Sequence, residues 1–215
     1  ASDPEAAPPP IRPARTIGRG GAAIPFKLTG RDLEILRAVH RYRYLRTGQV
    51  WRLLFPETRT LQSARRRLRR LTSGRYLVRI GRAGQAGEGF PESAFALGEA
   101  GAALLSSLGD ELIPFPRARP GGGHVFLEHA LAISEFRLAL ELALPAVTGI
   151  RLHRFVHEDE LKTHLRRGIS KDAYKLYNHL IHPRPGREYV VHPDALFILA
   201  TGEAPEVRRL YFLEI

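Results

Sequence analysis

The sequence predicts an α+β protein, in which helices and a hairpin are followed by a smaller module that ends in a β-meander. Three observations lead to this class. Three segments between residues 28 and 74 repeat apolar side chains at helical spacing. Two short β-prone segments follow around a glycine-rich loop. A break rich in Pro and Gly at 113–123 then precedes a long apolar helix and several further strands.

These composition changes divide the chain into four parts. Residues 1–25 are rich in Ala, Pro, Gly and Arg, and we expect them to be disordered or extended because they cannot form a core. We expect a DNA-binding domain at 26–110, a linker at 111–124 and an α/β module at 125–215.

The first two helices have clear start and stop signals. The first begins at Leu28-Thr29-Gly30-Arg31-Asp32, with Thr29 as its N-cap and Asp32 in its first turn. Its buried face is predicted to carry Leu33, Leu36, Val39 and His40. The second begins at Thr47 and runs to Phe55, where Pro56 ends it.

The segment from Thr60 to Leu71 predicts a helix with one apolar and one cationic face. Its apolar stripe consists of Leu61, Ala64, Leu68 and Leu71. Pointing away are Gln62, Ser63, Arg66, Arg69 and Arg70, while Arg65 and Arg67 flank the stripe. We expect Thr58 or Thr60 to cap this helix and Gly74 to end it.

This arginine helix contains five Arg and no acidic residue. A solvated surface helix is the alternative, but such helices usually mix Glu with Lys or Arg for pairing along the helix. Like charges without partners cost stability unless an anion meets them. The segment therefore favours a helix that faces phosphates.

A hairpin follows the arginine helix. Tyr76–Ile80 and Ser93–Leu97 read as strands around a loop at Gly81–Gly89, and a helix runs from Gly98 to Leu108. Three helices followed by a hairpin is the order of a winged helix-turn-helix, in which the third helix enters the major groove. The alternative is a small helical domain whose hairpin binds nothing. The DNA-binding candidates are Thr60, Gln62, Ser63, Arg65, Arg66, Arg67, Arg69, Arg70, Arg79 and Arg82.

The charge balance agrees with a nucleic-acid partner. The chain of 215 residues has 33 Lys plus Arg against 22 Asp plus Glu, a net charge of +11. Residues 31–109 alone hold 15 Arg, no Lys and 6 acids, a net charge of +9. Such a basic block is typical of proteins that bind double-stranded DNA, although a GC-rich genome also enriches Arg. There is no Cys, no apolar run of membrane-spanning length and no signal peptide, so we expect a cytoplasmic protein with no membrane contact.

The second module is predicted as one long apolar helix and several short elements. The helix covers 125–144 and is apolar over much of its circumference, so it should be buried. Strands are predicted at 149–156, 188–192, 195–200 and 207–215, a charged helix at 158–167, and a weak helix or loop at 173–181.

Several dispersed motifs resemble the replication-relaxation family, encoded mainly on plasmids and integrative elements. The motifs are Leu28-Thr29-x-Arg31-Asp32-x-x-Ile35-Leu36, Arg67-Leu68-x-x-Leu71-x-x-Gly74-x-Tyr76-Leu77, Phe95-Ala96-Leu97-Gly98-x-x-Gly101, Leu127-Glu128-His129-x-Leu131-Ala132-Ile133, His192-Pro193-Asp194-Ala195 and Phe212-Leu213-Glu214-Ile215. The resemblance covers about residues 27–215. It implies a winged helix and a role in replication initiation, DNA relaxation or conjugative transfer. Family members usually continue past the Glu-Ile pair, so the sequence is either a fragment or lacks the last elements.

Asp194 and Glu214 also resemble the metal-binding half of the PD-(D/E)xK nuclease pattern. A hairpin centred near residue 204 would pair positions 194 and 214 on one face. Glu135 is the candidate third ligand, and Mg²⁺ is implied only if this nuclease-like core is real. Against it, the Lys expected two residues after the Glu is missing, and Arg208 or Arg209 could neutralise the pair. A solvated acid pair, a degenerate PD-(D/E)xK-like core and an active nuclease all stay open.

Three functions follow from these observations. The first is a DNA-binding protein of a plasmid or mobile element, acting as a homodimer together with replication or relaxosome proteins. The second is a metal-dependent nuclease with a winged-helix targeting domain, and the third is a winged-helix transcription regulator. We expect the first, with binding rather than catalysis and no cofactor.

Overall fold

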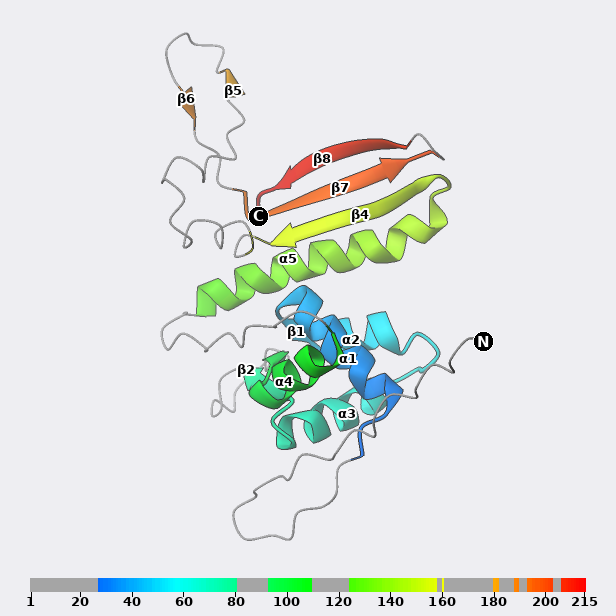
Figure 1. Cartoon of the computed structure of the whole chain (residues 1–215), viewed down its shortest axis with the longest axis vertical. Coiled ribbons are helices and arrows are strands. Elements are labelled where there is room, and N and C mark those ends of the chain that lie inside the picture. The colour runs from blue at the N-terminus through cyan, green and yellow to red at the C-terminus, as the bar shows by residue number, and fades with distance from the viewer. Residues whose placement is uncertain are drawn as a thin grey trace, which may run out of the picture. The chain divides into compact units, whose positions relative to one another are not determined.

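The computed structural model describes residues 27–80, 93–109, 124–157, 160, 180–181, 188–189, 193–202 and 206–215 (Figure 1). The expected tail at 1–25, the whole of the expected hairpin loop at 81–89 and nearly all of the expected linker lie outside these ranges. The chain divides into two compact units, 1–123 and 124–215. Each unit combines helices with a small antiparallel sheet, in agreement with the predicted α+β class.

The described part of the first unit contains four helices and three short strands. They are α1 (Gly30–Tyr42), β1 (Leu45–Arg46), α2 (Thr47–Leu54), α3 (Gln62–Ser73), β2 (Leu77–Ile80), β3 (Ala94–Leu97) and α4 (Glu99–Leu108). The predicted helices and both hairpin strands are confirmed within one or two residues. The strands form an antiparallel sheet in the order β1-β3-β2. Strand β1 was not predicted, because two residues are too few to show alternation.

The core of the first unit lies between α1, α2, α3 and the sheet. Of the four α1 residues expected to be buried, Leu36 and Val39 are fully buried and the other two are half-buried. Ile35 and Tyr42 complete the buried face instead. Leu45 on β1 is also fully buried and pairs with Phe95 on β3. The segment that follows α1 is therefore hydrogen-bonded to the hairpin.

The helix ends follow the sequence signals in part. Thr29 caps α1 with a capping box in which Asp32 is the reciprocal partner, as expected. The prediction of a threonine cap for α3 is wrong, because Leu61 occupies the N-cap position without a side-chain hydrogen bond. The hydroxyl of Thr58 instead accepts a hydrogen bond from Trp51 Nε1 at 2.9 Å and donates one to the carbonyl oxygen of Phe55 at 3.0 Å. Gly74 is the C-cap of α3, as predicted.

The second unit is a three-stranded antiparallel sheet with a long helix. It contains α5 (His124–Ala143), a short 3-10 helix η1 (Leu144–Ala146), β4 (Ile150–His157), β5 (Leu180–Ile181), β6 (Glu188–Tyr189), β7 (Ala195–Thr201) and β8 (Val207–Leu213). The sheet order is β4-β7-β8, and β5 pairs with β6. In Figure 1 the helix α5 runs along the sheet formed by β4, β7 and β8. Ile133, Phe155, Ala195 and Phe197 form the core between them.

Most predicted elements of the second unit are found, at 124–143, 150–157, 195–201 and 207–213. The strand expected at 188–192 is found at 188–189, and residues 180–181 form a strand where we expected helix or loop. The charged helix expected at 158–167 lies outside the described residues apart from Glu160, which is helical. No helix in the described ranges is both long and apolar enough to cross a membrane.

Candidate nucleic-acid interface

Helix α3 buries its apolar stripe and exposes its arginines. Ala64, Leu68 and Leu71 are each at most 1% exposed, which confirms three of the four residues of the predicted stripe. The fourth, Leu61, is half-buried at the N-cap position. The stripe packs toward α2 and β2, the neighbouring elements of the first unit. The exposed residues of the opposite face are Gln62, Arg65, Arg66, Arg69 and Arg70, while Ser63 is half-buried. The outward face is therefore almost purely cationic.

Three arginines of this face have no partner for their side chains in the part of the chain that the structure describes. No acidic residue occurs between Gln62 and Ser73. The side chains of Arg65, Arg66 and Arg69 form no ion pair or hydrogen bond with any other residue that the structure describes. An anion brought to this face would relieve the repulsion among the guanidinium groups and would meet planar, bidentate donors.

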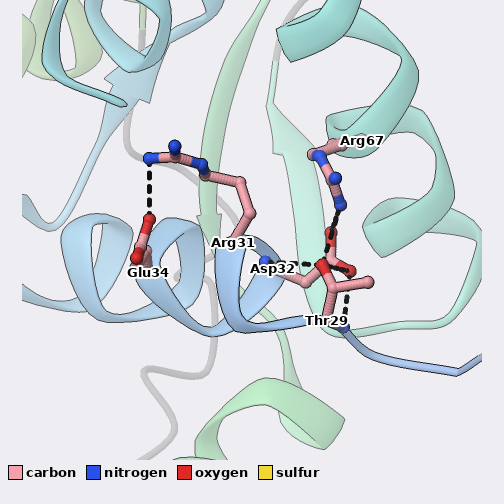
Figure 2. Close-up of polar contacts among 5 residues, drawn as sticks. All are labelled: Thr29, Arg31, Asp32, Glu34 and Arg67. Carbon is pink, nitrogen blue, oxygen red and sulfur yellow. Dashed lines mark hydrogen bonds and ion pairs between the residues drawn. The ribbon is translucent and has the colours of Figure 1, made fainter. Parts of the chain in front are cut away.

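Arg67 is arranged differently from the other arginines of α3. Its Nη1 atom donates to Asp32 Oδ1 at 3.0 Å and to Thr29 Oγ1 at 2.9 Å, so the side chain turns back onto α1 (Figure 2). The Arg67 side chain is 23% exposed and that of Asp32 only 2%. Sequence reasoning grouped Arg67 with the DNA-binding candidates, because its acidic partner lies 35 residues earlier and no local pattern reveals it.

The hairpin begins directly after α3. The amide of Arg75 donates to the carbonyl oxygen of Thr72 at 3.0 Å, and the amide of Tyr76 donates to the carbonyl oxygen of Leu71 at 2.9 Å. This pair of bonds is a Schellman motif, which reverses the chain and leads it into β2. Arg75 adopts the left-handed conformation (φ 61°) that glycine usually takes in this motif.

The remaining DNA-binding candidates are Thr60, Arg79 and Arg82. Arg79 on β2 is exposed, and its Nε donates to Ser93 Oγ at 2.8 Å. Thr60 is exposed just before α3. Arg82 lies outside the described residues.

In the second unit the strand register predicted for Asp194 and Glu214 is confirmed. The Asp194 carboxylate bonds other groups, however, and the Glu214 side chain is exposed. Ala195 pairs with Leu213, and the amide of Asp194 donates to the carbonyl of Leu213 at 2.9 Å. The Asp194 carboxylate lies 2.9 Å from His129 Nε2 through Oδ1 and accepts the amide of Ile215 at 2.9 Å through Oδ2. Glu214 is exposed.

The three candidate carboxylates do not gather into a metal site. Glu135 is half-buried on α5. Within the ranges that the structure describes, no group of three His, Asp or Glu side chains could hold a metal ion, so Asp194, Glu214 and Glu135 do not form one. The arginines considered as neutralising partners lie elsewhere: Arg208 pairs with Glu206, and Arg209 lies opposite Leu199.

Two charged groups of the second unit were missed by sequence reasoning. Arg208 and Arg151 both contact Glu206, and the hydrogen bond from Arg208 is the main cause that lowers the pKa of Glu206. On α5, Arg137 is buried and donates to Glu141 Oε1 at 2.8 Å. The i,i+4 spacing of that pair was a visible signal, whereas the contacts of Glu206 depend on strand pairing.

Comparison with protein families gives one finding. The family model described as replication-relaxation matches residues 36–215, which is most of the chain and includes α2, α3, the hairpin and the second unit. Comparisons with curated proteins and with solved structures give no match.

Proposed function

Because the chain belongs to the replication-relaxation family, we propose that it is a winged-helix protein that binds double-stranded DNA through α3. Family membership supports a role in the replication or relaxation of a plasmid or mobile element. Within that role the proposal assigns DNA binding to the first unit and the phosphate and base contacts to the arginine face of α3.

The order of the elements supports the winged-helix assignment. The first unit runs α1-β1-α2-α3-β2-β3, with the strands paired as β1-β3-β2. In winged helices the third helix is the one that enters the major groove, and the hairpin after it lies against the DNA backbone. On this assignment α3 is the recognition helix, and Arg79 on β2 contacts the backbone beside it.

The arginine face of α3 is the observation that carries the proposal. A recognition helix needs exposed donors on one face and an apolar stripe on the other, and α3 has both. Arg65, Arg66 and Arg69 have no acidic partner in the described structure, so no internal ion pair must break when DNA arrives. Arginine can contact phosphate or the O6 and N7 atoms of guanine with two parallel hydrogen bonds.

The experiment is fluorescence anisotropy with labelled duplex DNA across a salt series. Replacing Arg66 and Arg69 with Ala should weaken binding to every duplex, and the slope of log affinity against log salt should shrink by about one unit for each phosphate that the variant no longer binds. Arg209→Ala is the control for each single substitution, Arg66→Ala and Arg69→Ala, since it also removes one exposed arginine but from the second unit. The assignment of α3 fails if the Arg66→Ala/Arg69→Ala double variant binds as tightly as the parent at low salt.

The second unit is proposed as a binding or assembly module without a catalytic step. Asp194 already bonds His129 and the amide of Ile215, and no described geometry favours cleavage over binding. Magnesium-dependent nicking of supercoiled DNA would contradict the non-catalytic assignment.

We also propose a homodimer that works with replication or relaxosome proteins in replication initiation, relaxation or conjugative transfer. Such a dimer should protect two half-sites about 34–36 Å apart, or a multiple of that distance, in a footprint.

A further inference from the structure

The carboxylate of Asp32 is buried and held by three donors. Its residue is 1% exposed. Oδ2 accepts the amide of Thr29 at 2.9 Å and the hydroxyl of Thr29 at 2.7 Å, and Oδ1 accepts Arg67 Nη1 at 3.0 Å. A buried carboxylate is tolerated only when charge and hydrogen bonds compensate for the missing water. Thr29 alone supplies two donors, and Arg67 supplies the compensating charge.

The hydroxyl of Thr29 uses its full hydrogen-bonding capacity in the same cluster. It donates its one proton to Asp32 Oδ2 and accepts from Arg67 Nη1 at 2.9 Å and from the amide of Asp32 at 3.3 Å. A hydroxyl has one donor and two acceptor positions, so none is left over. Figure 2 shows Arg67 reaching from its own helix to Thr29 and Asp32 at the start of α1. The cluster therefore has one geometry that satisfies all of its members.

This cluster restrains the rotation of α3 about its own axis. The buried side chains of Ala64, Leu68 and Leu71 also hold α3 in place, but apolar contacts are not directional. The bonds from Arg67 Nη1 are directional and weaken quickly when the angle changes. Because Arg66 is the neighbour of Arg67 in sequence, any rotation that breaks the cluster also moves Arg66 on the exposed face.

We infer that Thr29 and Asp32 are positioning residues that act through Arg67 to orient the arginine face of α3 toward the DNA bases. This inference rests on the proposed function. Arg67 then has a different role from the other arginines of α3: Arg67 orients the helix, whereas Arg66 and Arg69 contact DNA. The competing role for Arg67 is a phosphate contact, and the two roles predict opposite effects of changing Asp32.

The experiment compares two duplexes: one selected from a random-sequence pool by the parent protein, and a scrambled duplex of the same length. Asp32→Asn removes a negative charge, so electrostatics alone predicts tighter binding to both duplexes. Positioning predicts the reverse for the selected duplex. We expect affinity to fall about tenfold or more there and less than about twofold on the scrambled duplex, because a misplaced helix no longer reaches the bases but still reaches the phosphates.

Arg67→Gln and Arg66→Gln form the matched pair on α3. Each removes one positive charge from adjacent positions of one helix. Arg66→Gln should lower the salt slope by about one unit on both duplexes. Arg67→Gln should leave the salt slope unchanged and lower affinity mainly for the selected duplex. The double variant Asp32→Asn/Arg67→Gln should bind the selected duplex as tightly as the single variant with the lower affinity, because each single substitution already removes the bond between Asp32 and Arg67.

Each result decides the inference. It is overturned if Arg67→Gln lowers the salt slope as Arg66→Gln does, or if Asp32→Asn tightens binding to the selected duplex. It is also overturned if the parent binds the selected and scrambled duplexes equally. Should Asp32→Asn fail to fold, as judged by circular dichroism, the Arg67→Gln variant, whose site is partly exposed, decides the question. If the parent binds no duplex at all, the proposed function fails and the inference fails with it, whereas the results above overturn the inference alone.

Discussion

The amide of Gly98 donates a hydrogen bond of 2.8 Å to the carbonyl oxygen of Tyr76, where the chain leaving α3 crosses the start of α4. The backbones approach so closely that a Cβ on Gly98 would lie 2.2 Å from the carbonyl oxygen of Arg75. A Cβ on Gly101 would lie 2.3 Å from the carbonyl oxygen of Tyr76. The glycines of Gly98-x-x-Gly101 are therefore a steric requirement of the junction between α3, β2 and α4 in this chain.

Gly98→Ala should destabilise the protein strongly. The new methyl group meets backbone atoms that cannot move aside as a flexible side chain would, so we expect the free energy of unfolding to fall by about 1–3 kcal/mol or more. Gly30→Ala is the control, since nothing lies within 4 Å of its Cβ position. It should be neutral or stabilising by up to about 1 kcal/mol. Urea unfolding followed by circular dichroism measures both, and equal stabilities would contradict the steric argument.

Arg75→Gly should stabilise the protein. Arg75 has a φ of 61°, a conformation that costs a non-glycine residue about 1–2 kcal/mol. The change also removes the ion pair between Arg75 and Glu99, whose side chains are 75% and 68% exposed and whose bond contributes about 0–1 kcal/mol. Glu99→Gln removes that ion pair alone and serves as the reference. Thermal unfolding should place Arg75→Gly above Glu99→Gln in midpoint temperature, and the reverse order would refute the strain argument.

Asp194 and Glu214 should differ in their effect on stability, although the strand register places them at neighbouring positions. Asp194→Ala removes the bonds to His129 Nε2 and to the amide of Ile215 and should cost about 1–3 kcal/mol. Glu214→Gln changes an exposed side chain and should stay within about 0.5 kcal/mol of the parent. If repulsion between two facing carboxylates dominated instead, both variants would be more stable than the parent in urea unfolding.

Glu206 should titrate with a pKa below its usual value of 4.5, because the hydrogen bond from Arg208 and then that from Arg151 favour its charged form. A lowered pKa in the folded protein means that the stabilisation is present above the usual value and disappears as the pH falls through the lowered pKa. The effect on stability should be small, since the side chains of Arg208 and Arg151 are 56% and 59% exposed. NMR titration of the Glu206 carboxyl carbon should show a larger upward pKa shift in Arg208→Ala than in Arg151→Ala. An unchanged pKa in both variants would contradict these contacts.

The helices of the first unit were predictable because their signals are local. Apolar spacing located α3, and the burial of Ala64, Leu68 and Leu71 confirms it. The Thr29-x-x-Asp32 spacing predicted the cap of α1, because both partners lie in one turn. Thr58 was misread as a helix cap because its actual donor, Trp51 Nε1, belongs to the preceding helix. Strand β1 was missed because it exists only through its pairing with β3.

The candidate site was predictable in outline. The sequence located a cationic helix face, and its exposed arginines lie where the periodicity placed them. Counting residues outward from a hairpin centre near residue 204 also placed Asp194 and Glu214 in the correct strand register, because side chains alternate along paired strands. It could not show that the Asp194 carboxylate would bond His129 on α5 instead of facing Glu214.

The sequence by itself determined the α+β class, the arginine face of α3 and the family, because periodicity, charge and short motifs are properties of neighbouring residues. Only the tertiary structure decided that Arg67 bonds Asp32 and Thr29 and that Gly98 must lie against Tyr76. The reason is physical: an arginine is equally compatible with water, phosphate or a carboxylate, and which of these it meets depends on residues that folding brings together from distant parts of the chain.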